Sequence, residues 1–238
     1  MNMTPAWRRL LIVLVALMMT ACASTQTAST DPRDPFENYN RAMFRFNTSL
    51  DENVIKPVAT GYADYVPSFI RTAVGNFFGN LGDVWTALNN YLQGKPRDGS
   101  SDVGRVALNS TFGLLGLIDV ATPMGLPKHD EDLGQTLGVW GVKSGPYLVL
   151  PFFGASTVRD GLAKPVDLVY GDALNYVGNQ RFENTSRVVR VIDDRAAFLG
   201  SSSLMENAAL DPYQFYRDAY LQRREARVRD GRDANDRD

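Results

Sequence analysis

The sequence predicts a mostly α-helical protein, and two observations support this class. Apolar residues recur at spacings of three and four in several segments, which is the period of one helix face. Few segments show the period-two alternation that is typical of strands. One stretch departs from the helical pattern: Gly134–Gly154, GQTLGVWGVKSGPYLVLPFFG, which carries a single formal charge, Lys143, in a chain that is 22% charged.

This glycine-rich stretch is as long as a membrane-spanning helix, which needs about 20 apolar residues. Glycine and proline interrupt it at seven positions: Gly134, Gly138, Gly141, Gly145, Pro146, Pro151 and Gly154. Inside a helix glycine costs about 1 kcal/mol and proline about 3 kcal/mol. We therefore expect a short helix over residues 130–140, a bend, and an extended run over Pro146–Phe153, forming a hairpin.

Two interpretations of this hairpin stay open at the level of sequence. It is either a buried hairpin in an ordinary core or a membrane-dipping segment. Lipid tolerates irregular backbone only where protein or a water-filled cavity covers it, so the second interpretation requires a protein-lined cavity beside the hairpin.

The start of the chain has the features of an export signal. Arg8 and Arg9 precede an apolar core, LLIVLVALMM, and small residues follow it. Met19-Thr20-Ala21-Cys22 is similar to a bacterial lipobox, with methionine in place of the usual leucine, and Cys22 is the one cysteine in the chain. The sequence thus predicts a lipoprotein signal over residues 1–21 and lipidation of Cys22, while an intrachain disulfide is impossible.

The remaining chain divides into a tether, one domain and a charged tail. Residues 22–33 are small and polar and are expected to form a lipidated tether. Residues 34–221 make one domain, with enough apolar (44%) and aromatic (11%) residues in the chain for a core. Residues 222–238 form a charged tail, which we expect to be disordered at its end, although close opposite charges would support a helix in its early part.

The charge balance speaks against nucleic acid as a partner. Removal of Arg8 and Arg9 with the signal lowers the Lys+Arg count from 25 to 23 against 27 Asp+Glu, which gives a net charge of −4. Binding of nucleic acid needs a basic face, and this composition does not provide one.

The first predicted helix begins at Asp34-Pro35-Phe36-Glu37, where Asp34 is placed to cap and Glu37 completes a capping-box pattern. Five apolar residues then fall on one stripe: Phe36, Tyr39, Met43, Phe46 and Leu50. Spacing alone favours burial of this stripe over contact with a membrane. Pro57 is expected to end the helical region.

Further helices follow in order. We expect them over residues 58–65, 68–78, 83–93 and 99–112, with a break at Gly79–Gly82 and caps within Gly99–Asp102. Residues 114–125 are apolar and broken by glycine, and they are candidates to pack against the hairpin. In the second half, helices are expected over residues 157–163 with Ser156 as cap, 166–177, 182–199 and 213–229, the last beginning at Asp211-Pro212. The inward residues expected in the 182–199 helix are Phe182, Val188, Val189 and Ile192.

The inventory of catalytic residues is thin. His129 is the single histidine, so a cysteine–histidine pair or a multi-histidine metal site cannot be built. Asp130-Glu131-Asp132 is either a cation site, an acid pair or a negatively charged helix start, and the last is favoured. Arg159-Asp160 could pair across a bend, line a polar channel or be solvated, and the sequence does not rank these alternatives. We predict no catalytic residue, no cofactor and no metal.

Several short blocks, in order and at specific spacing, resemble the MlaA (VacJ) family. The blocks are Asp34-Pro35-Phe36-Glu37-x-x-Asn40-Arg41-x-Met43-Phe44-x-Phe46-Asn47, Asp64-Tyr65-Val66-Pro67, Gly134-Gln135-Thr136-Leu137-Gly138, Gly145-Pro146-Tyr147-x-x-Leu150-Pro151-Phe152-x-Gly154, Arg159-Asp160 and Asp211-Pro212-Tyr213. Together they extend from about Asp34 to Tyr220.

The resemblance implies a fold and a function. The family consists of lipoproteins anchored in the outer membrane of Gram-negative bacteria, facing the periplasm. The expected fold is a ring-like bundle of amphipathic helices in the inner leaflet around a central channel. The expected activity is retrograde transport: mislocalised phospholipid leaves the outer leaflet and passes to a periplasmic phospholipid-carrier protein, which maintains lipid asymmetry. A trimeric porin is the expected partner in the membrane.

The resemblance also implies roles for particular residues. Arg45, Phe46 and Asn47 match the segment that governs how the channel opens. The hairpin beside the channel supplies the membrane-facing candidates Trp140, Tyr147, Leu148, Leu150 and Phe152. Two alternatives from other classes remain: a lipid-modifying enzyme at the periplasmic face, and a structural lipoprotein that tethers porins.

Overall fold

The computed structural model describes residues 31–200 and 210–230. The predicted signal, Cys22, residues 22–30 of the tether and the last eight residues of the tail lie outside this part of the chain. The elements are α2 (Glu37–Leu50), η1 (Asp51–Ile55), α3 (Lys56–Tyr65), α4 (Ser68–Leu92), α5 (Pro96–Thr111), α6 (Leu133–Val139), β1 (Tyr147–Leu150), β2 (Gly154–Thr157), α7 (Val158–Tyr170), η2 (Ala173–Tyr176), α8 (Gln180–Ala197) and α10 (Pro212–Arg229).

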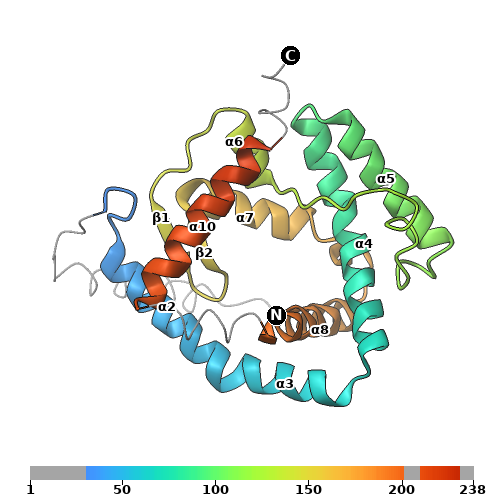
Figure 1. The fold of residues 1–238 in the computed structure, drawn as a ribbon, viewed down its shortest axis with the longest axis horizontal. Helices are drawn as coiled ribbons and strands as arrows, with labels where there is room; N and C mark the ends of the chain where they lie inside the picture. The colour runs from blue at the N-terminus through green and yellow to red at the C-terminus, as the bar shows by residue number, and fades with distance from the viewer. Residues whose placement is uncertain (1–30, 201–209, 231–238) are drawn as a thin grey trace, which may run out of the picture.

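The elements are arranged as a ring, which confirms the predicted mostly helical class (Figure 1). In this view α2 and α3 form the lower edge, and α4 rises along one side with α5 packed outside it. The β1–β2 hairpin and α10 lie on the opposite side, and α6 and α7 complete the upper part. The first described helix and the last therefore meet, and their contact with the hairpin closes the ring.

The lower edge of the ring is continuous where the sequence suggested a break at Pro57. α2 runs through one π-helical turn, η1, directly into α3, and Pro57 lies in the first turn of α3. Proline is tolerated there because the N–H groups of a first turn have no partner within the helix. The helix therefore continues past Pro57, whose nitrogen cannot donate a hydrogen bond, by way of the wider π-helical turn before it. The expected helix end at Pro57 is wrong.

α4 is also longer than expected, because the glycines at positions 79 and 82 do not break it. The helix runs without interruption over 25 residues. Asn80, between the two glycines, is buried and donates from Nδ2 to the Ser110 hydroxyl on α5 (3.0 Å). Packing of α4 against α5 outweighs the low helix propensity of glycine, which is a weak preference that tertiary contacts override.

Three further boundaries differ from the sequence prediction. α5 begins at Pro96, and Asp102, expected among its caps, is fully buried inside the helix. Thr157, not Ser156, caps α7 by accepting from the Asp160 N–H, and α7 continues through Pro165 to Tyr170. The expected 166–177 helix is thus replaced by the end of α7 and the short η2.

The last helix extends beyond the expected domain boundary at Leu221. Asp211 caps α10 as predicted by accepting from the Gln214 N–H. The helix then continues to Arg229, and Arg224 is buried. The end at Arg229 agrees with the helix expected over residues 213–229 and with a helical early part of the charged run, while the burial of Arg224 shows that this part is packed rather than solvated.

The apolar faces of two helices point outward, contrary to expectation. Phe36 and Phe46 on α2 are 48% and 43% exposed, and Phe182 and Val188 on α8 are 46% and 59% exposed. The buried positions are polar or small instead: Asn40 on α2, and Ser186, Asp193 and Ala196 on α8. The reason is that the inner partners of these helices offer hydrogen bonds, which an apolar face could not satisfy.

The same inversion holds for the described part of the chain as a whole. Over residues 31–200 and 210–230 only nine apolar residues are buried, against 22 polar or charged ones, while 34 large apolar residues are exposed. The core cluster consists of Tyr147, Val149 and Tyr213. Within the same ranges, none of the helices combines the length and apolar character that crossing a bilayer would need.

Residues 112–125 form a tight apolar loop after α5. Its contacts are with α4 and α5, not with the hairpin as expected: a Cβ on Gly116 would lie 2.7 Å from the Asn80 side chain, and Asn109 Oδ1 accepts from the N–H groups of Val120 and Ala121. Phe112, Leu114, Leu115 and Ile118 stay exposed at its surface.

Close packing at Gly138 on α6 generates a first prediction. A Cβ at this position would lie 2.6 Å from Arg159 Nη1 and 2.8 Å from Val228 Cγ1. Gly138→Ala should therefore lower the stability by about 1–3 kcal/mol, as overpacking does. Gly82→Ala is the matched control, because its Cβ would meet nothing within 4 Å in a helix, and it should be neutral or stabilising by up to about 1 kcal/mol. Urea unfolding of both variants measures this, and an equal response of the two would contradict the packing argument.

Candidate functional site

Two asparagines on α2 hold the hairpin by its outer edge. Asn40 donates to the carbonyl oxygen of Tyr147 (3.1 Å) and accepts from the N–H of Val149 (2.8 Å). Asn47 repeats the pattern further along, donating to the carbonyl oxygen of Leu150 (2.9 Å) and accepting from the N–H of Phe152 (2.8 Å). Each side-chain amide thus takes the place of a backbone amide in a neighbouring strand. We call this arrangement the asparagine clamp.

The spacing of the clamp matches the two elements it joins. Asn40 and Asn47 are seven residues apart, so they share a helix face and are separated by about 10.5 Å along the axis. The bonded carbonyl groups of Tyr147 and Leu150 are three residues apart, which is about 10 Å along a strand. Sequence reasoning identified Asn47 but missed Asn40. The available signal was the spacing of seven residues between Asn40 and Asn47, which places both on one helix face.

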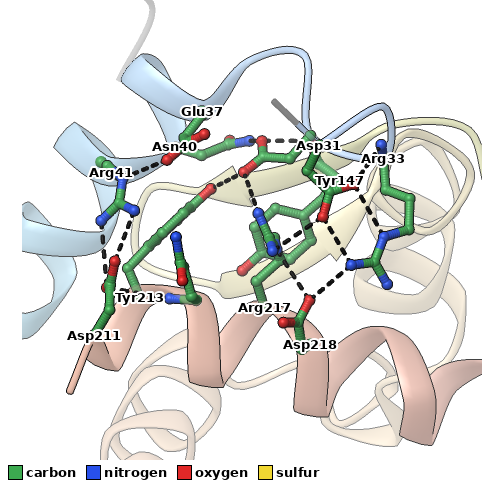
Figure 2. A network of polar contacts seen from close by, with 12 residues as sticks. Asp31, Arg33, Glu37, Asn40, Arg41, Tyr147, Asp211, Tyr213, Arg217 and Asp218 are labelled. Carbon is green, nitrogen blue, oxygen red and sulfur yellow. Dashed lines mark hydrogen bonds and ion pairs between the residues drawn. The ribbon is translucent and has the colours of Figure 1, made fainter. Parts of the chain in front are cut away.

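A buried polar cluster lies beneath the clamp, where α2, the hairpin and α10 meet (Figure 2). Asp34 is fully buried at its centre. It accepts from Asn40 Nδ2 (2.7 Å), from the Tyr213 hydroxyl and from Arg217 Nη1 (3.4 Å). The sequence suggested that Asp34 caps α2, and this is wrong. Phe36 occupies the cap position of α2, and the Asp34 carboxylate accepts hydrogen bonds in the interior.

The tyrosines of this Asp34 cluster keep their protons. Burial raises the pKa of Tyr213 far above its usual value, and the hydrogen bond to Asp34 raises it further. Burial likewise raises the pKa of Tyr147, helped by the negative charge of Asp34. The Tyr213 hydroxyl is thus a fixed donor to Asp34, which ties the start of the described chain to its last helix.

Arg41 extends the connection between α2 and α10. It donates to Glu37 within its own helix (2.8 Å) and to the Asp211 carboxylate at the start of α10 (2.8 Å). Its guanidinium also lies over the Tyr213 ring, 4.4 Å from the ring centre. Figure 2 shows Asp211 and Tyr213 converging on Arg41 from one end of α10.

A second buried cluster joins α10 to α6 and α7. Arg224 donates to both carboxylate oxygens of Asp132 (2.6 Å each) and to Asp160 (2.9 Å), and the Tyr220 hydroxyl also donates to Asp160 (2.8 Å). Arg159 pairs with its neighbour Asp160 (2.9 Å). Of the alternatives left open for Arg159-Asp160, the structure shows a buried ion pair.

The acidic run before α6 serves the fold as expected of a charged helix start. Asp132 caps α6 by accepting from the Gln135 N–H (2.8 Å), while Glu131 pairs with Lys95 (3.2 Å). No group of three or more His, Cys, Asp or Glu side chains in residues 31–200 and 210–230 is arranged to hold a metal ion. Sequence reasoning missed Arg224, because its place in a charged, apolar-poor run resembled a solvated tail.

The membrane-facing candidates of the hairpin divide between the two sides of the sheet. β1 pairs with β2 antiparallel, Tyr147 opposite Thr157 and Leu150 opposite Gly154. Tyr147 is buried in the core, so its expected membrane-facing position is wrong, because strand alternation turns it with Val149 toward α10. Leu148 and Leu150 are half-buried.

The tip of the hairpin is apolar and exposed. Phe152 is 70% exposed and adopts the left-handed backbone conformation (φ +68°), which non-glycine residues rarely occupy. Its ring packs edge-on against Phe46 of α2, with 5.3 Å between ring centres. Two of the three channel-opening candidates, Phe46 and Asn47, thus contact the hairpin candidate Phe152, whereas the third, Arg45, is exposed. Trp140 lies elsewhere, at the end of α6, where its indole N–H donates to the Leu92 carbonyl (2.9 Å).

One face of α4 is apolar and exposed. Val84, Leu88, Tyr91 and Leu92 form an exposed stripe at helical spacing. The opposite face is buried and polar, with Asp83, Thr86 and Asn90 among its residues. Asp83 pairs with Arg105 of α5 (3.2 Å) in a nearly water-free contact. The helix is therefore amphipathic in the reverse sense of a helix in a water-soluble core.

These features define a class: a helical protein whose helices are joined by buried, hydrogen-bonded charges and whose exposed surface is rich in large apolar residues. The chain belongs to the MlaA lipoprotein family, whose model matches residues 32–227. It is 37% identical to the intermembrane phospholipid transport system lipoprotein MlaA of Escherichia coli K12, over 89% of this chain and 85% of that protein. The corresponding protein of Haemophilus influenzae is 32% identical over 92% of this chain and 90% of its own length.

A solved structure confirms the fold. That structure concerns the structural basis for maintenance of bacterial outer membrane lipid asymmetry. The likeness has a TM-score of 0.71 at 37% sequence identity and covers 82% of this chain and 98% of that chain. The family resemblance read from the sequence blocks is thereby confirmed.

The asparagine clamp yields a prediction about local opening of the hairpin. Asn47→Leu should speed hydrogen exchange of the Phe152 N–H about tenfold, the equivalent of one hydrogen bond of about 1.4 kcal/mol, while leaving the Val149 N–H unchanged because Asn40 still holds it. Asn40→Leu should lower global stability, since it leaves the buried Asp34 carboxylate, the Tyr147 carbonyl and the Val149 N–H without the hydrogen bonds that Asn40 makes. Asn53→Leu is the control, because Asn53 bonds only Ser49 within its own helical segment. Equal exchange at Phe152 in the Asn47→Leu and Asn53→Leu variants would refute the clamp.

The Arg224 cluster yields a prediction about pH. Burial acts to raise the pKa of Asp160, but the hydrogen bonds and charge of Arg224 outweigh it and hold this pKa below its usual value. The stability from Asp160 is therefore fully present above the unfolded-state pKa of about 3.9 and is lost as pH falls through the lower folded-state value. Asp160→Asn should lose about 3 kcal/mol at pH 7 by leaving Arg224 underpaired, and should flatten the decline below pH about 4.

Urea midpoints at neutral pH and in steps below pH about 4 measure this effect. Asp167→Asn is the control, because burial raises the pKa of Asp167, so that its charge opposes folding as pH rises. That variant should keep the wild-type decline in acid. A decline in Asp160→Asn as steep as in the wild type would contradict the assigned role of Asp160.

Proposed function

We propose that this protein carries out phospholipid transport at the bacterial outer membrane, removing mislocalised phospholipid from the outer leaflet to maintain lipid asymmetry. The observation that carries this proposal is the inverted distribution of side chains: 34 large apolar residues exposed and 22 polar or charged residues buried among the described residues. A water-soluble protein rarely exposes large contiguous apolar surface, and such surfaces mark sites of interaction with membranes or partners.

The chemistry of the substrate fits this distribution. A phospholipid has a charged head group and apolar tails, so its path needs polar groups and an apolar surface close together. The relatives named above are phospholipid transport lipoproteins, and transport requires no bond to be made or broken. This agrees with a site built of hydrogen-bonded charges rather than of a nucleophile and a base.

The route and the partners are finer parts of the proposal. The protein is held at the outer membrane by lipidation of Cys22, with the helical domain facing the periplasm in the inner leaflet. Phospholipid moves through a central channel of the ring and is passed to a periplasmic carrier protein. A trimeric porin holds the ring in position. Apolar helix faces such as the α4 stripe support a position of the domain within the leaflet, because moving apolar surface out of water is favourable by about 25 cal/mol per Å².

The hairpin is the proposed controlling element. Phe46 and Asn47 contact the hairpin tip through a ring contact and a pair of hydrogen bonds, so a movement of α2 would move Phe152 with it. We place the channel-opening role on this contact, with Arg45 beside it at the surface. Leu148, Leu150 and Phe152 supply the apolar side of the hairpin, while Trp140 contributes an apolar ring at the end of α6.

A deletion strain tests the proposed function. Loss of the gene should raise the phospholipid exposed in the outer leaflet, measured with a membrane-impermeant amine label, and a wild-type copy should restore it. A copy with Asn47→Leu should restore it incompletely, because the hairpin tip is released, whereas Asn53→Leu should restore it fully.

Two outcomes would support the rival functions instead. Unchanged outer-leaflet phospholipid in the deletion strain, with a loss of porin association, would indicate a structural tether. Release of fatty acid from phospholipid by the purified protein, followed by mass spectrometry, would indicate a lipid-modifying enzyme.

A further inference from the structure

A cleft of about 360 Å³ opens between the first turns of α4 and the last turns of α8. It shares no residue with the asparagine clamp, the Asp34 cluster or the Arg224 cluster. α4 contributes Ser68, Arg71, Thr72 and Asn76 to its lining, and α8 contributes Asp193. Side chains of opposite charge thus line one cleft.

Asp193 is a buried carboxylate that lacks a cationic partner. It is 8% exposed, and its hydrogen bond is with the Tyr62 hydroxyl, which donates to Oδ1 (2.9 Å). Burial raises the pKa of Tyr62 to about 12, helped by Asp193, so the hydroxyl stays a neutral donor. No ion pair among the described residues includes Asp193. A buried charge without a partner of opposite charge is costly, so this group favours a cationic ligand.

Arg71 supplies the opposite charge on the α4 wall. Its Nε donates to the Val66 carbonyl (3.1 Å), which orients the guanidinium, while its terminal nitrogens make no hydrogen bond with the described residues. Ser68 and Thr72 lie on the same helix face, three residues before and one residue after Arg71. The N-terminal end of a 25-residue helix adds positive potential there, and planar guanidinium is well suited to phosphate.

Two exposed aromatic residues lie close to the lining residue Ser68 in the chain. Phe69, which follows it directly, is 72% exposed, and Tyr65, three residues before it, is 89% exposed. Arg71 and Asp193 do not neutralise each other by an ion pair, so the cleft has a positive group on its α4 wall and a negative group on its α8 wall, and exposed aromatic residues lie close to it in the chain. A ligand that matches this pattern carries a phosphate, a positively charged nitrogen a few bonds away, and an apolar tail.

We propose that the cleft between α4 and α8 binds the zwitterionic head group of an aminophospholipid, with its phosphate on Arg71 and the two hydroxyls and its ammonium on Asp193. The proposal deepens the proposed function and rests on it for the lipid source. A primary ammonium is favoured over a quaternary one, because only the former donates hydrogen bonds to the buried Asp193 carboxylate. The cleft would thereby give the transporter a preference among head groups.

Calorimetric titration of the purified full chain with short-chain lipids, below their micelle concentrations, tests this proposal. Dihexanoyl phosphatidylethanolamine should bind about tenfold more tightly than the phosphatidylcholine and phosphatidylglycerol analogues, a difference of about 1.4 kcal/mol. Asp193→Asn, which still accepts from Tyr62, should remove this preference and leave phosphatidylglycerol binding unchanged. Arg71→Gln should weaken all three lipids, because they share the phosphate.

Glu183→Gln is the matched control, since Glu183 is a carboxylate of α8 that pairs with Arg187 and does not line the cleft. It should leave all three affinities unchanged. Equal binding of the three lipids by the wild-type protein would overturn the proposal without any variant, and so would an equal loss for all three lipids in Asp193→Asn. Free phosphoethanolamine binding as tightly as its lipid would also overturn it, by indicating a water-soluble ligand.

Transfer of total phospholipid between vesicles separates this proposal from the proposed function. Transfer that proceeds without head-group preference would refute the cleft as a head-group site and leave the transport function standing. Selective binding without transfer of any lipid would support the cleft and count against transport.

Discussion

The fold depends on buried, hydrogen-bonded charges at the junctions between its helices. Asp34 receives donors from α2 and α10, and Arg224 joins two carboxylates from the loop before α6 and from α7. Such groups hold helices together because each is costly to leave unpaired, so separating the helices would strand several charges at once. This makes the junctions strongly directional: unlike apolar contacts, they specify one arrangement of partners.

Because buried polar contacts hold the helices together, the apolar faces of the helices need not be buried in a core. α4 illustrates this consequence, since Asp83 and its polar neighbours face α5 while Val84, Leu88 and Tyr91 stay exposed. An ordinary helix buries its apolar stripe to stabilise the protein in water. Here the apolar surface stays exposed, and the stability that it does not supply comes from the polar junctions. Structure and proposed function thus follow from one inverted distribution of residues.

The hairpin combines buried polar contacts with exposed apolar surface. Its base is fixed by Asn40 and by the burial of Tyr147 and Val149, whereas its tip is held by Asn47 and by the ring contact of Phe46 with the exposed Phe152. Two-stranded hairpins are marginally stable alone, so the α2 amides that cover the free edge of β1 decide its position. Because the tip is the less buried half, it is the part that can move while the base stays in place.

The sequence by itself determined the helical class, the family and the α10 start at Asp211-Pro212, because these rest on local periodicity, turn residues and ordered blocks. It also predicted the extended run that contains β1, but not the pairing strand β2 over Gly154–Thr157. The tertiary structure decided which face of each helix is inside, since Asn40 became buried and Phe36 exposed against the expectation from spacing. It also decided that Asp34 bonds to the neighbouring α10 instead of capping α2, and that Arg224 is packed instead of solvated. Local propensity specifies where a helix forms, but the partner of a buried charge lies far away in the chain, and only the closed ring brings the two together.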